Sequence, residues 1–531
     1  MNAAPLPKAT AKNKPNKAPL MRTGQRLSEQ IYWERDMATE LQQDGGAGGA
    51  LSELDEFSQI LKQNFKPRSD VAAREVENAV STLVREALTD ESVISDDILD
   101  TIDKMIAKID EKLTLQVNEI IHNAEYQKLE SSWRGLAYTV NNTESDATLK
   151  LKVMNVSKTE LDKELRSYPG AKWDQSPLFK KIYEAEFGQL GGQPFGALVG
   201  DFAFDHSSSD VRLLRDLGKI AAASHAPFIT SPAPTLLGMD SWNELGNPRD
   251  LSTVFDTPDY AGWNSLRDSE NSRYIALAMP RVLSRTPYGQ NGEPVEEFNF
   301  EETTDGHEGT QYAWMNAAHA MAVNINRAHK EYGWTVQIRG VTSGGEISGL
   351  PVHNFDVGDG TTDMKCPTEF AISDRREGEL SKSGIMPLVH RKNTDRAAFI
   401  GAQSLYRPKK YQIEEATASD NLSSRIPYIF AVSRFSHYLK CMVRDMVGSN
   451  KERDQLETEL SNWIRQYVHG SPSTASESEK ARLPLAAAKV EVIEDEENPG
   501  YYVGRFFLRP HYQLEGMDIG MSLVSKLPGG K

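Results

Sequence analysis

Residues 195–204 read Phe-Gly-Ala-Leu-Val-Gly-Asp-Phe-Ala-Phe, an apolar run of the length expected for one buried strand. A stretch with helical periodicity follows over 209–223, and a second apolar run occupies 226–231. A strand, a helix and a strand in this order form a βαβ-like unit, whose two strands lie parallel in one sheet. This unit predicts an α/β fold with mixed helices and strands.

Further elements extend the unit in both directions along the chain. Alternating apolar residues predict a half-exposed strand over 147–156. Ser176-Pro177 opens a helix, because Ser is a good N-cap and Pro fits the first helical position. Strands are expected over 272–279 and 334–340, and a helix over 311–331 lies between them.

The C-terminal part combines two strong helical patterns with strands. The helices are expected over 427–447 and 450–469, and a hairpin of two strands over 490–492 and 501–509. A last alternating strand is expected over 517–523. Because an uncovered strand edge pairs readily with another chain, these strands are candidates for contacts between subunits.

The N-terminal part has a different composition. Residues 1–50 form a basic tail and a Gly-rich linker with too few apolar residues to fold. Residues 51–145 carry apolar stripes at helical spacing, one of which consists of Ile98, Ile102, Met105, Ile109 and Leu113. Another stripe passes through Leu129, Trp133, Leu136 and Val140. Such stripes must pack on the rest of the chain or on a helix of another protein.

These patterns predict four regions. They are a disordered tail and linker over 1–50, a helical region over 51–145, an α/β body over 146–410, and a C-terminal domain with helices and strands over 411–531. The 531 residues are too many for a single core, which agrees with a multi-domain protein.

Charge and hydropathy narrow the function classes. The formal net charge is −16, although residues 1–26 carry six basic and no acidic side chains. An acidic body repels nucleic-acid backbones. The chain has no apolar run near the ~20 residues of a membrane helix, and no apolar stretch of a signal peptide follows the basic tail. We therefore expect a cytoplasmic protein that binds no nucleic acid and does not insert into a membrane.

Metal and disulfide sites are not expected. The two cysteines, Cys366 and Cys441, form no metal-binding pair and are expected to be small buried apolar residues. Asp356, Asp359 and Asp363 lie in a Gly-rich acidic loop, but their spacing does not match a calcium loop.

Motifs of catalysis are also missing. The Gly-rich stretch 340–345 is followed by Glu346, where a phosphate-binding loop needs Lys. Asp205, His206 and Asp210 follow a strand, as catalytic groups of α/β enzymes do, but Ser and Asp in this position also cap a helix. We predict no cofactor and no enzyme activity.

Several motifs together resemble one family. Residues 125–136 read Glu-Tyr-Gln-Lys-Leu-Glu-Ser-Ser-Trp-Arg-Gly-Leu, which is similar to a segment of the large sheath subunit of type VI secretion systems, the TssC or VipB family. The resemblance covers roughly residues 55–531 and continues at 173–177, 194–196, 198–202, 247–250, 364–369, 387–392, 399–403, 438–440, 484–488 and 507–514.

This resemblance implies a structural role and a set of partners. The chain is expected to pair with a small sheath subunit, TssB or VipA. The pairs are expected to stack as a helical tube around an inner tube of Hcp rings. The sheath would grow from a baseplate and contract to propel the inner tube, and the ClpV ATPase would disassemble it, mainly through the small subunit. The fold should contain the core of phage tail sheaths, with neighbouring protomers tied by terminal strands.

Three surfaces are candidates for these contacts. The stripe from Ile98 to Leu113 is expected to bind the small subunit. The C-terminal strands are expected to pair with neighbouring protomers through Tyr501, Tyr502, Val503, Phe506, Phe507 and Leu508. The helix over 450–468 is a candidate for facing the inner tube with Glu452, Asp454, Glu457 and Glu459.

Two alternatives remain at this point. A phage-tail or tailocin-like sheath built from a single type of chain would not need a second subunit. A cytoplasmic α/β enzyme would have its site near Asp205 and His206.

Overall fold

The computed structural model describes Asn78 and residues 98–511, apart from 247–249, 291, 359, 450, 472–473 and 495–501. The chain divides into two compact units, Met1–Asp110 and Glu111–Lys531. The basic tail, the linker, the stripes before residue 98 and the strand expected over 517–523 lie outside the described residues.

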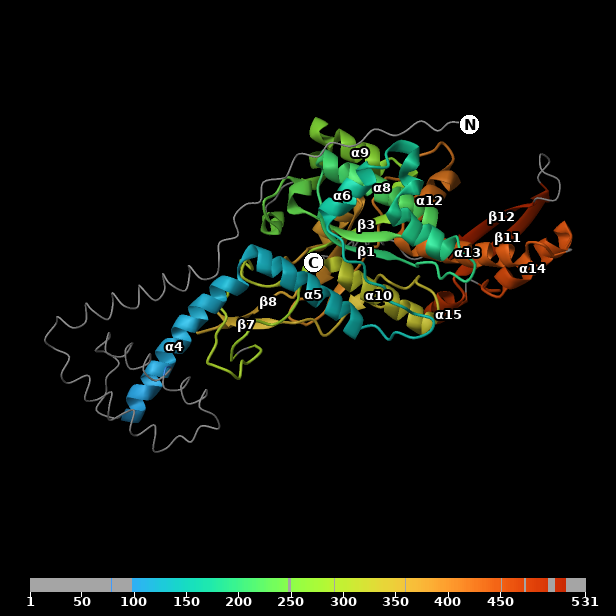
Figure 1. The fold of residues 1–531 in the computed structure, drawn as a ribbon. Helices are drawn as coiled ribbons and strands as arrows, with labels where there is room; N and C mark the ends of the chain where they lie inside the picture. The colour runs from blue at the N-terminus through green and yellow to red at the C-terminus, as the bar shows by residue number, and fades with distance from the viewer. Residues whose placement is uncertain are drawn as a thin grey trace, which may run out of the picture. The chain divides into compact units, whose positions relative to one another are not determined.

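A six-stranded sheet forms the centre of the second unit (Figure 1). Its strands run in the order β1-β2-β3-β9-β10-β6, with bounds Leu198–Phe204, Phe228–Pro232, Ile275–Met279, Ile385–His390, Ala397–Phe399 and Glu346–Ile347. The first four strands are parallel, and β10 is antiparallel to both β9 and β6. The predicted βαβ unit is confirmed as β1, the helix α8 (Ser208–Ser224) and β2.

Helices cover both faces of this sheet. On one face, α8 packs with α9 (Ala261–Arg267) and α11 (Asp374–Lys382) over a core that includes Phe204 and Leu277. On the other face, α10 (Ala317–Tyr332) and the start of α13 (Ile426–Met446) enclose a second core. The chain therefore has the expected mixed α/β architecture, arranged as three layers (Figure 1).

Local signals fix the ends of the two central helices. Ser207 caps α8, because its side chain accepts from the Asp210 N–H, and His225 ends the helix in the left-handed conformation. Asn316 caps α10 by accepting from the Ala318 N–H at 2.8 Å, and Gly333 ends it with a positive φ of 79°.

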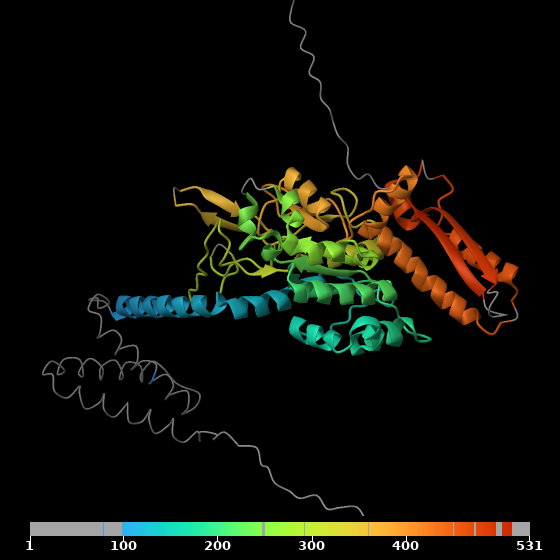
Figure 2. The same cartoon turned by 90° about the horizontal axis from the view of Figure 1, so that it is seen from above.

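The C-terminal hairpin and the helices before it gather at one end of the second unit in Figure 2. They enclose a core of their own. It contains α12 (Glu414–Ser423), α13, α14 (Arg453–Arg465) and α15 (Glu477–Arg482), followed by the hairpin of β11 (Leu485–Glu494) and β12 (Tyr502–Pro510). The expected hairpin is confirmed, and its ladder runs from the Leu485–Pro510 pair to the Glu494–Tyr502 pair.

The remaining elements precede the sheet in the sequence or connect its strands and helices. The helices are α4 (Ile98–Ile121), α5 (Ala124–Asn141), α6 (Lys158–Arg166), the single turn α7 (Pro177–Phe179) and a π-helix, Lys180–Phe187. Two short antiparallel pairs complete the fold: β4 (Val282–Leu283) with β5 (Trp314–Met315), and β7 (His353–Asp356) with β8 (Thr362–Lys365).

Three expectations about secondary structure are wrong. Residues 147–156 form no strand, and Val153 is 67% exposed there, because alternation alone supplies no hydrogen-bonded neighbour. Residues 334–340 form no strand either, since β6 occupies the edge of β10 in their place. The helix expected from residue 311 begins at Ala317, and Trp314 belongs to β5.

Candidate functional site

The stripe expected to bind the small subunit lies along α4. Ile98 and Ile102 fall in the helix, but their side chains lie outside the described residues. Met105 and Ile109 are half-buried, and Leu113 is 40% exposed. The helix continues past the stripe to Ile121.

A break at residues 122–123 separates α4 from α5. Asn123 caps α5, because its side chain accepts from the Glu125 N–H at 2.9 Å. One turn earlier, Asn118 holds the end of α4 on the loop after β4: its Nδ2 donates to the Glu301 carbonyl at 3.1 Å, and its Oδ1 accepts from the Thr303 N–H at 2.8 Å.

The inner face of α5 packs tightly on α10. Thr139 Oγ1 lies 2.9 Å from His319 Nδ1, and Gly135 sits directly against the same imidazole ring. Burial lowers the pKa of His319. The Gly of the Trp-Arg-Gly-Leu motif is therefore required by the close approach of the two helices.

A buried network of charges also fastens α5. Arg285 Nε donates to Glu130 at 2.7 Å, and Arg285 Nη1 donates to Glu302 at 2.5 Å. Burial alone would lower the pKa of Arg285, but the hydrogen bonds from its guanidinium to Glu302 and Glu130 outweigh burial and raise it. Burial likewise opposes ionisation of Glu130, yet Arg285 and Arg134 hold the pKa of that carboxyl below its usual value.

The outer face of α5 is apolar and exposed. Trp133 is 65% exposed and Leu129 is 57% exposed. The sequence pattern identified these residues as a stripe, but no contact was assigned to them. Periodicity reports which residues share a face, and only the packing of α5 on α10 decides which face remains free.

The C-terminal hairpin has one packed face and one open face. Phe506 and Leu508 are half-buried against the C-terminal core, whereas Val503 and Phe507 are 50% and 54% exposed. Tyr502 is 39% exposed at the start of β12, and Tyr501 lies outside the described residues. The sheet contains two strands among the residues that the structure describes.

The two edges of this hairpin differ. Beside β11, Glu457 Oε2 accepts from the Val492 N–H at 3.0 Å, so α14 covers that edge. Val492 and Gly504 face each other in the ladder. Because the Val492 N–H points away from β12, this pair is not hydrogen-bonded, and the Gly504 N–H points away from β11. Among the residues that the structure describes, the edge without a neighbouring element is therefore that of β12.

The four acidic residues of α14 do not share one surface. Glu457 is half-buried and faces β11, whereas Asp454 is exposed and pairs with Arg453 at 2.7 Å. Glu459 pairs with Lys451 at 2.6 Å, and the Glu452 N–H donates to Gln455 Oε1 at 3.3 Å at the start of the helix. The expected acidic face is thus split, because positions 452, 454, 457 and 459 spread around the helix axis.

Asp205, His206 and Asp210 have structural partners. The Asp210 carboxylate accepts from the Asp205 N–H at 2.9 Å and pairs with Lys158 at 2.7 Å. Burial opposes ionisation of Asp205, but hydrogen bonds from Ser207 hold its pKa below the usual value. The His206 ring stacks on Tyr260, with centroids 4.3 Å apart. This arrangement anchors the start of α8.

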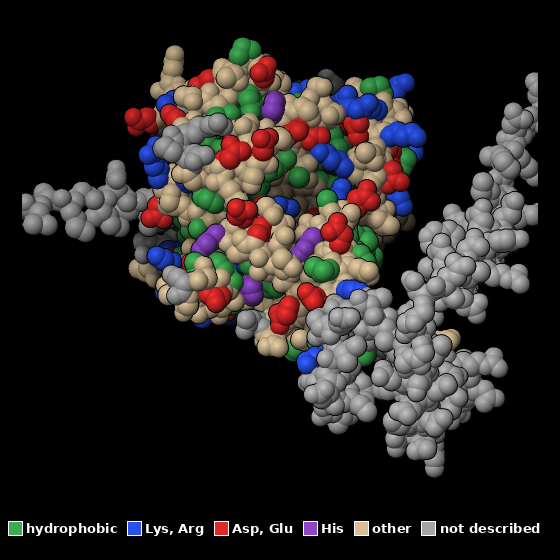
Figure 3. Space-filling model, turned by 90° about the vertical axis from the view of Figure 1, so that its left-hand side faces the viewer, with side chains coloured by type: hydrophobic (Ala, Val, Ile, Leu, Met, Phe, Trp, Pro, Cys, Tyr) green, Lys and Arg blue, Asp and Glu red, His purple; other side chains and the backbone are tan. Residues whose placement is uncertain are grey.

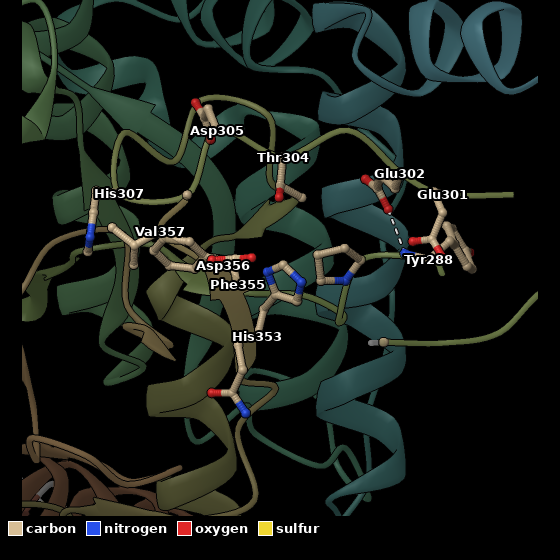
Figure 4. Close-up of a pocket in the computed structure, with 14 residues that line it drawn as sticks. Tyr288, Glu301, Glu302, Thr304, Asp305, His307, His353, Phe355, Asp356 and Val357 are labelled. Carbon is tan, nitrogen blue, oxygen red and sulfur yellow. Dashed lines mark hydrogen bonds between the residues drawn. The ribbon is translucent and has the colours of Figure 1, made fainter. Parts of the chain in front are cut away.

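A polar cavity of about 540 Å³ lies between the β7–β8 hairpin and the loop that follows β4 (Figure 4). Several of its lining groups are engaged with the backbone or with side chains beside the cavity. Glu302 accepts from the Tyr288 N–H at 2.8 Å, and His307 Nε2 lies 3.3 Å from Asp363. His353 Nδ1 lies 2.9 Å from the Tyr312 hydroxyl, and burial lowers the pKa of His353.

Acidic and histidine side chains are spread over the face seen in Figure 3. Within the described part of the chain, no group of three or more His, Cys, Asp and Glu side chains is placed to hold a metal ion. Asp356 and Asp363 belong to β7 and β8, and Asp359 lies outside the described residues.

The cysteines are half-buried and free, which corrects the expectation that both are buried. Cys366 Sγ lies 3.0 Å from Thr368 Oγ1. Burial would raise the pKa of Cys366, but the neighbouring His390 outweighs it and lowers the pKa. Polar neighbours, which the sequence spacing does not report, keep this side chain from behaving as an apolar residue.

Models of known families match most of the chain. Residues 103–406 match the VipB model, described as the EvpB/VC_A0108 tail sheath N-terminal domain. Residues 415–527 match VipB_2, the tail sheath gpW/gp25-like domain of the same description. The α/β body and the C-terminal part together therefore define a tail-sheath protein.

The similarity to one relative is more specific. The type VI secretion system sheath protein TssC1 of Pseudomonas aeruginosa is 59% identical over 476 residues, which cover 90% of this chain and 96% of the relative. The chain belongs to the VipB family of type VI secretion sheath proteins, and it is a subunit of a contractile sheath.

Solved structures with weaker similarity were also found. One is the anti-feeding prophage baseplate, at 11% identity and a TM-score of 0.35, covering 60% of this chain and 66% of that chain. Another is the contracted helical sheath of the same prophage, at 14% identity and a TM-score of 0.32, covering 60% and 68%. Among the described residues, no helix is both long and apolar enough to span a membrane.

Proposed function

We propose that this chain is the large subunit of a two-component sheath, which pairs with a small sheath subunit and polymerises around an inner tube. The observation that carries the proposal is the 59% identity to a sheath protein over 96% of that protein's length. Contacts that repeat without closing on themselves generate helical polymers, as a tubular sheath requires. The chain supplies these surfaces as a structural component and not as an enzyme.

Co-expression with the small subunit from the same genome tests the proposal. We expect hollow, cogwheel-shaped tubes in electron micrographs when both chains are present, and none when the large chain is expressed alone. Tubes formed by the large chain alone would instead support a single-component sheath. Turnover of a small molecule by the purified chain would contradict the structural role.

The α4 stripe is the first proposed contact with the small subunit. Its support is the series of apolar residues from Ile98 to Leu113, of which Leu113 is 40% exposed. Asp at both Ile102 and Ile109 should abolish co-purification of the small subunit. Ala107→Asp changes an exposed position on another side of the same helix and serves as the control. Equal co-purification by all variants would refute this contact.

The β12 edge is the proposed link between neighbouring protomers. Its support is the outward direction of the Gly504 N–H and the exposed side chains of Val503 and Phe507. A chain that ends after Asn498 should still form heterodimers but no filaments by negative-stain microscopy. Gly504→Pro removes one outward N–H while the chain length stays complete, and it should weaken polymerisation in the same direction. Normal filaments from the truncated chain would exclude the link.

The exposed acids of α14 are proposed to face the inner tube. Glu452 and Glu459 remain for this contact, because Glu457 is engaged with β11 and Asp454 lies on the other side of the helix from these two. Reversing their charge should leave the assembly of empty sheaths unchanged and reduce the assembly of sheaths around the inner tube. If empty and tube-filled sheaths respond equally, these acids form an ordinary solvated surface.

The remaining assignments follow from family membership. We propose a small-subunit-binding region over 51–145, a sheath body over 146–410 and a C-terminal sheath domain over 411–531, which follow the basic tail and linker over 1–50. Assembly is expected in the bacterial cytoplasm, from an envelope-anchored baseplate around Hcp rings. The ClpV ATPase is expected to act mainly through the small subunit.

A further inference from the structure

A cysteine and a histidine meet where two strands end. Cys366 directly follows β8, and His390 is the last residue of β9. Their side chains are joined by a hydrogen bond, and both are half-buried. A thiol beside an imidazole is the arrangement in which a cysteine becomes a nucleophile, because the imidazole takes up the thiol proton.

The contacts of the imidazole determine which of its nitrogens serves the thiol. His390 Nε2 lies 2.8 Å from the Thr394 carbonyl, which can only accept a hydrogen bond, so Nε2 carries a proton. Nδ1 is then left for Cys366, and in the neutral ring it accepts the thiol proton. Thr394 itself is held in the turn between β9 and β10, because its Oγ1 donates to the Arg391 carbonyl at 2.6 Å. The imidazole is therefore oriented as a base for the thiol.

The surroundings of the two side chains favour the charged form of each. Thr368 Oγ1 lies 3.0 Å from Cys366 Sγ, and a hydroxyl can donate to a thiolate. Burial opposes ionisation of both side chains, yet the hydrogen bonds from His390 and Thr368 lower the pKa of Cys366. The hydrogen bond to Cys366 also outweighs burial at the imidazole and raises the pKa of His390. Both directions agree with a proton that has moved from sulfur to nitrogen.

The segment that carries Cys366 is fixed in place and bears a further positive charge. The Glu369 N–H donates to the Arg281 carbonyl at 2.9 Å, and the side chains of these two residues form an ion pair at 2.6 Å. Lys365 precedes the cysteine, interacts electrostatically with it, and donates from Nζ to the His307 carbonyl at 2.8 Å. A cation beside a sulfur stabilises the thiolate.

We propose that Cys366 and His390 form a thiolate–imidazolium pair and that Cys366 is a site of oxidation by hydrogen peroxide. The sulfur attacks one peroxide oxygen, so that an S–O bond forms while the O–O bond breaks. Cys366 is thereby oxidised by two electrons to a sulfenic acid, and the peroxide is reduced. The departing hydroxide takes the proton from His390 and leaves as water.

The other cysteine of the chain is the internal control. Cys441 is also half-buried, and its sulfur accepts from Arg444 Nη2 at 3.6 Å. A guanidinium has no lone pair that could take up the thiol proton. The two cysteines therefore have similar burial, but only Cys366 has a base as its hydrogen-bond partner.

Alkylation of the complete chain tests the ion pair. Iodoacetamide reacts with thiolates, and mass spectrometry distinguishes the peptides that contain Cys366 and Cys441. At pH 7 we expect Cys366 to react at least about threefold faster than Cys441, because a larger thiolate fraction outweighs the lower nucleophilicity of a stabilised thiolate. In the urea-unfolded chain the two rates should be equal. Equal rates in the folded chain, or a slower reaction at Cys366, would overturn the proposal.

His390→Gln separates the role of the imidazole from simple exposure of the thiol. Gln keeps an amide donor for the Thr394 carbonyl but cannot take up a proton. Alkylation of Cys366 at pH 7 should slow at least about threefold, and the midpoint of its rate against pH should rise. An unchanged rate at Cys441 in the same molecule shows that the variant is folded. A pH profile of Cys366 that is identical in both proteins would refute the pair.

Peroxide treatment tests the oxidation itself. The complete chain is exposed to an equimolar amount of hydrogen peroxide in the presence of dimedone, which labels sulfenic acids. We expect at least about threefold more label at Cys366 than at Cys441, since the thiolate is the form that peroxide oxidises. His390→Gln should reduce the label at Cys366. Equal label at both cysteines, or label at neither, would overturn the assignment of Cys366 as an oxidation site.

Discussion

Gly135 and His319 meet where α5 crosses α10, and their contact shows how single residues set the position of an exposed surface. A Cβ atom added at Gly135 would lie 2.5 Å from His319 Cδ2, which is closer than real Cβ contacts allow. The imidazole is buried and contacts Thr139, so it has little freedom to move. The identity of residue 135 therefore controls how closely α5 approaches the body.

Gly135→Ala should destabilise the chain, although Ala is the better helix former. The helix gains about 1 kcal/mol from the substitution, but overpacking against a buried ring costs about 1–3 kcal/mol. We expect the free energy of unfolding in urea to fall by about 1 kcal/mol in net terms. Adding His319→Ala should recover part of the loss, because it removes the clash. Unchanged stability of Gly135→Ala would show that α5 shifts freely on α10.

His437 should make the chain sensitive to acid. Burial lowers its pKa to about 4, and its Nε2 donates to the Ser224 carbonyl at 2.8 Å. Between about pH 6.5 and pH 4 the unfolded chain binds a proton at this residue and the folded chain does not, so stability falls as the pH falls. Across this pH range the titration of His437 should lower the free energy of unfolding by about 3 kcal/mol.

The measurement is the slope of the unfolding free energy against pH. His437→Gln keeps an amide donor for the Ser224 carbonyl and removes the titrating imidazole. Between pH 6.5 and pH 4 the unfolding free energy of this variant should therefore depend less on pH, by the equivalent of up to one bound proton. Other buried histidines keep some slope in both proteins, because burial also lowers the pKa of His225 and His319. Identical slopes would argue against His437 as a source of the acid sensitivity.

At the scale of elements, the hairpin and α14 form one packed pair, in which one edge of the hairpin is covered and the other is open within the described part of the chain. Leu460 and Ile464 of α14 are buried against β11. The Glu457 carboxylate accepts a hydrogen bond from the Val492 N–H, which points away from β12. Covering one edge leaves a single direction for strand addition, which is how natural sheets limit uncontrolled pairing.

Glu457→Ala should weaken the hairpin and expose the second edge. A hydrogen bond to a charged acceptor contributes about 1.5–3 kcal/mol, and partial exposure places the expected loss near the lower value. Chemical unfolding should show this loss, Glu457→Gln should show less, and aggregation of the Ala variant should rise. Glu459→Ala, which removes an exposed ion pair with Lys451, is the control and should change stability by less than about 1 kcal/mol. Equal effects at both positions would argue against a special role for Glu457.

At the scale of the whole second unit, α13 connects two cores. Ile426, Ile429 and Phe430 at its start belong to the core on one face of the large sheet. Phe435 and Leu439, further along, belong to the C-terminal core with Trp334. One continuous helix therefore joins the core of the large sheet to the core of the C-terminal hairpin.

Hydrogen exchange should differ strongly between the sheet and the hairpin. Every residue of β2 and β3 is buried, whereas β12 belongs to a two-stranded sheet with exposed residues. In the isolated chain, amides of β12 should exchange at least about tenfold faster than those of β3. In assembled sheaths the β12 amides should slow down, since a neighbouring strand would then protect them. Equal rates for β12 before and after assembly would contradict strand addition at this edge.

The sequence by itself determined the family, the central βαβ unit and the helices α8, α13 and α14, and it determined α10 except for its start. The family motif and these elements depend on local signals: apolar periodicity, capping residues and Gly or Pro at the ends. The predicted and observed ends of α8 and α13 agree within a few residues. Ser207 marks the start of α8 as its N-cap, and Pro427 marks the first turn of α13. The hairpin was also predicted, since a turn-rich segment separates two alternating strands.

Only the tertiary structure decided the features that depend on contacts distant in sequence. It replaced the strand expected over 334–340 with β6 and left 147–156 without a neighbouring strand among the described residues. It turned Glu457 toward β11 and showed that Trp133 faces outward. Periodicity places residues on a common face of a helix or strand, but long-range packing decides which face is buried and which strand edge remains open. For a sheath subunit, those free faces and edges are the candidates for contacts between subunits.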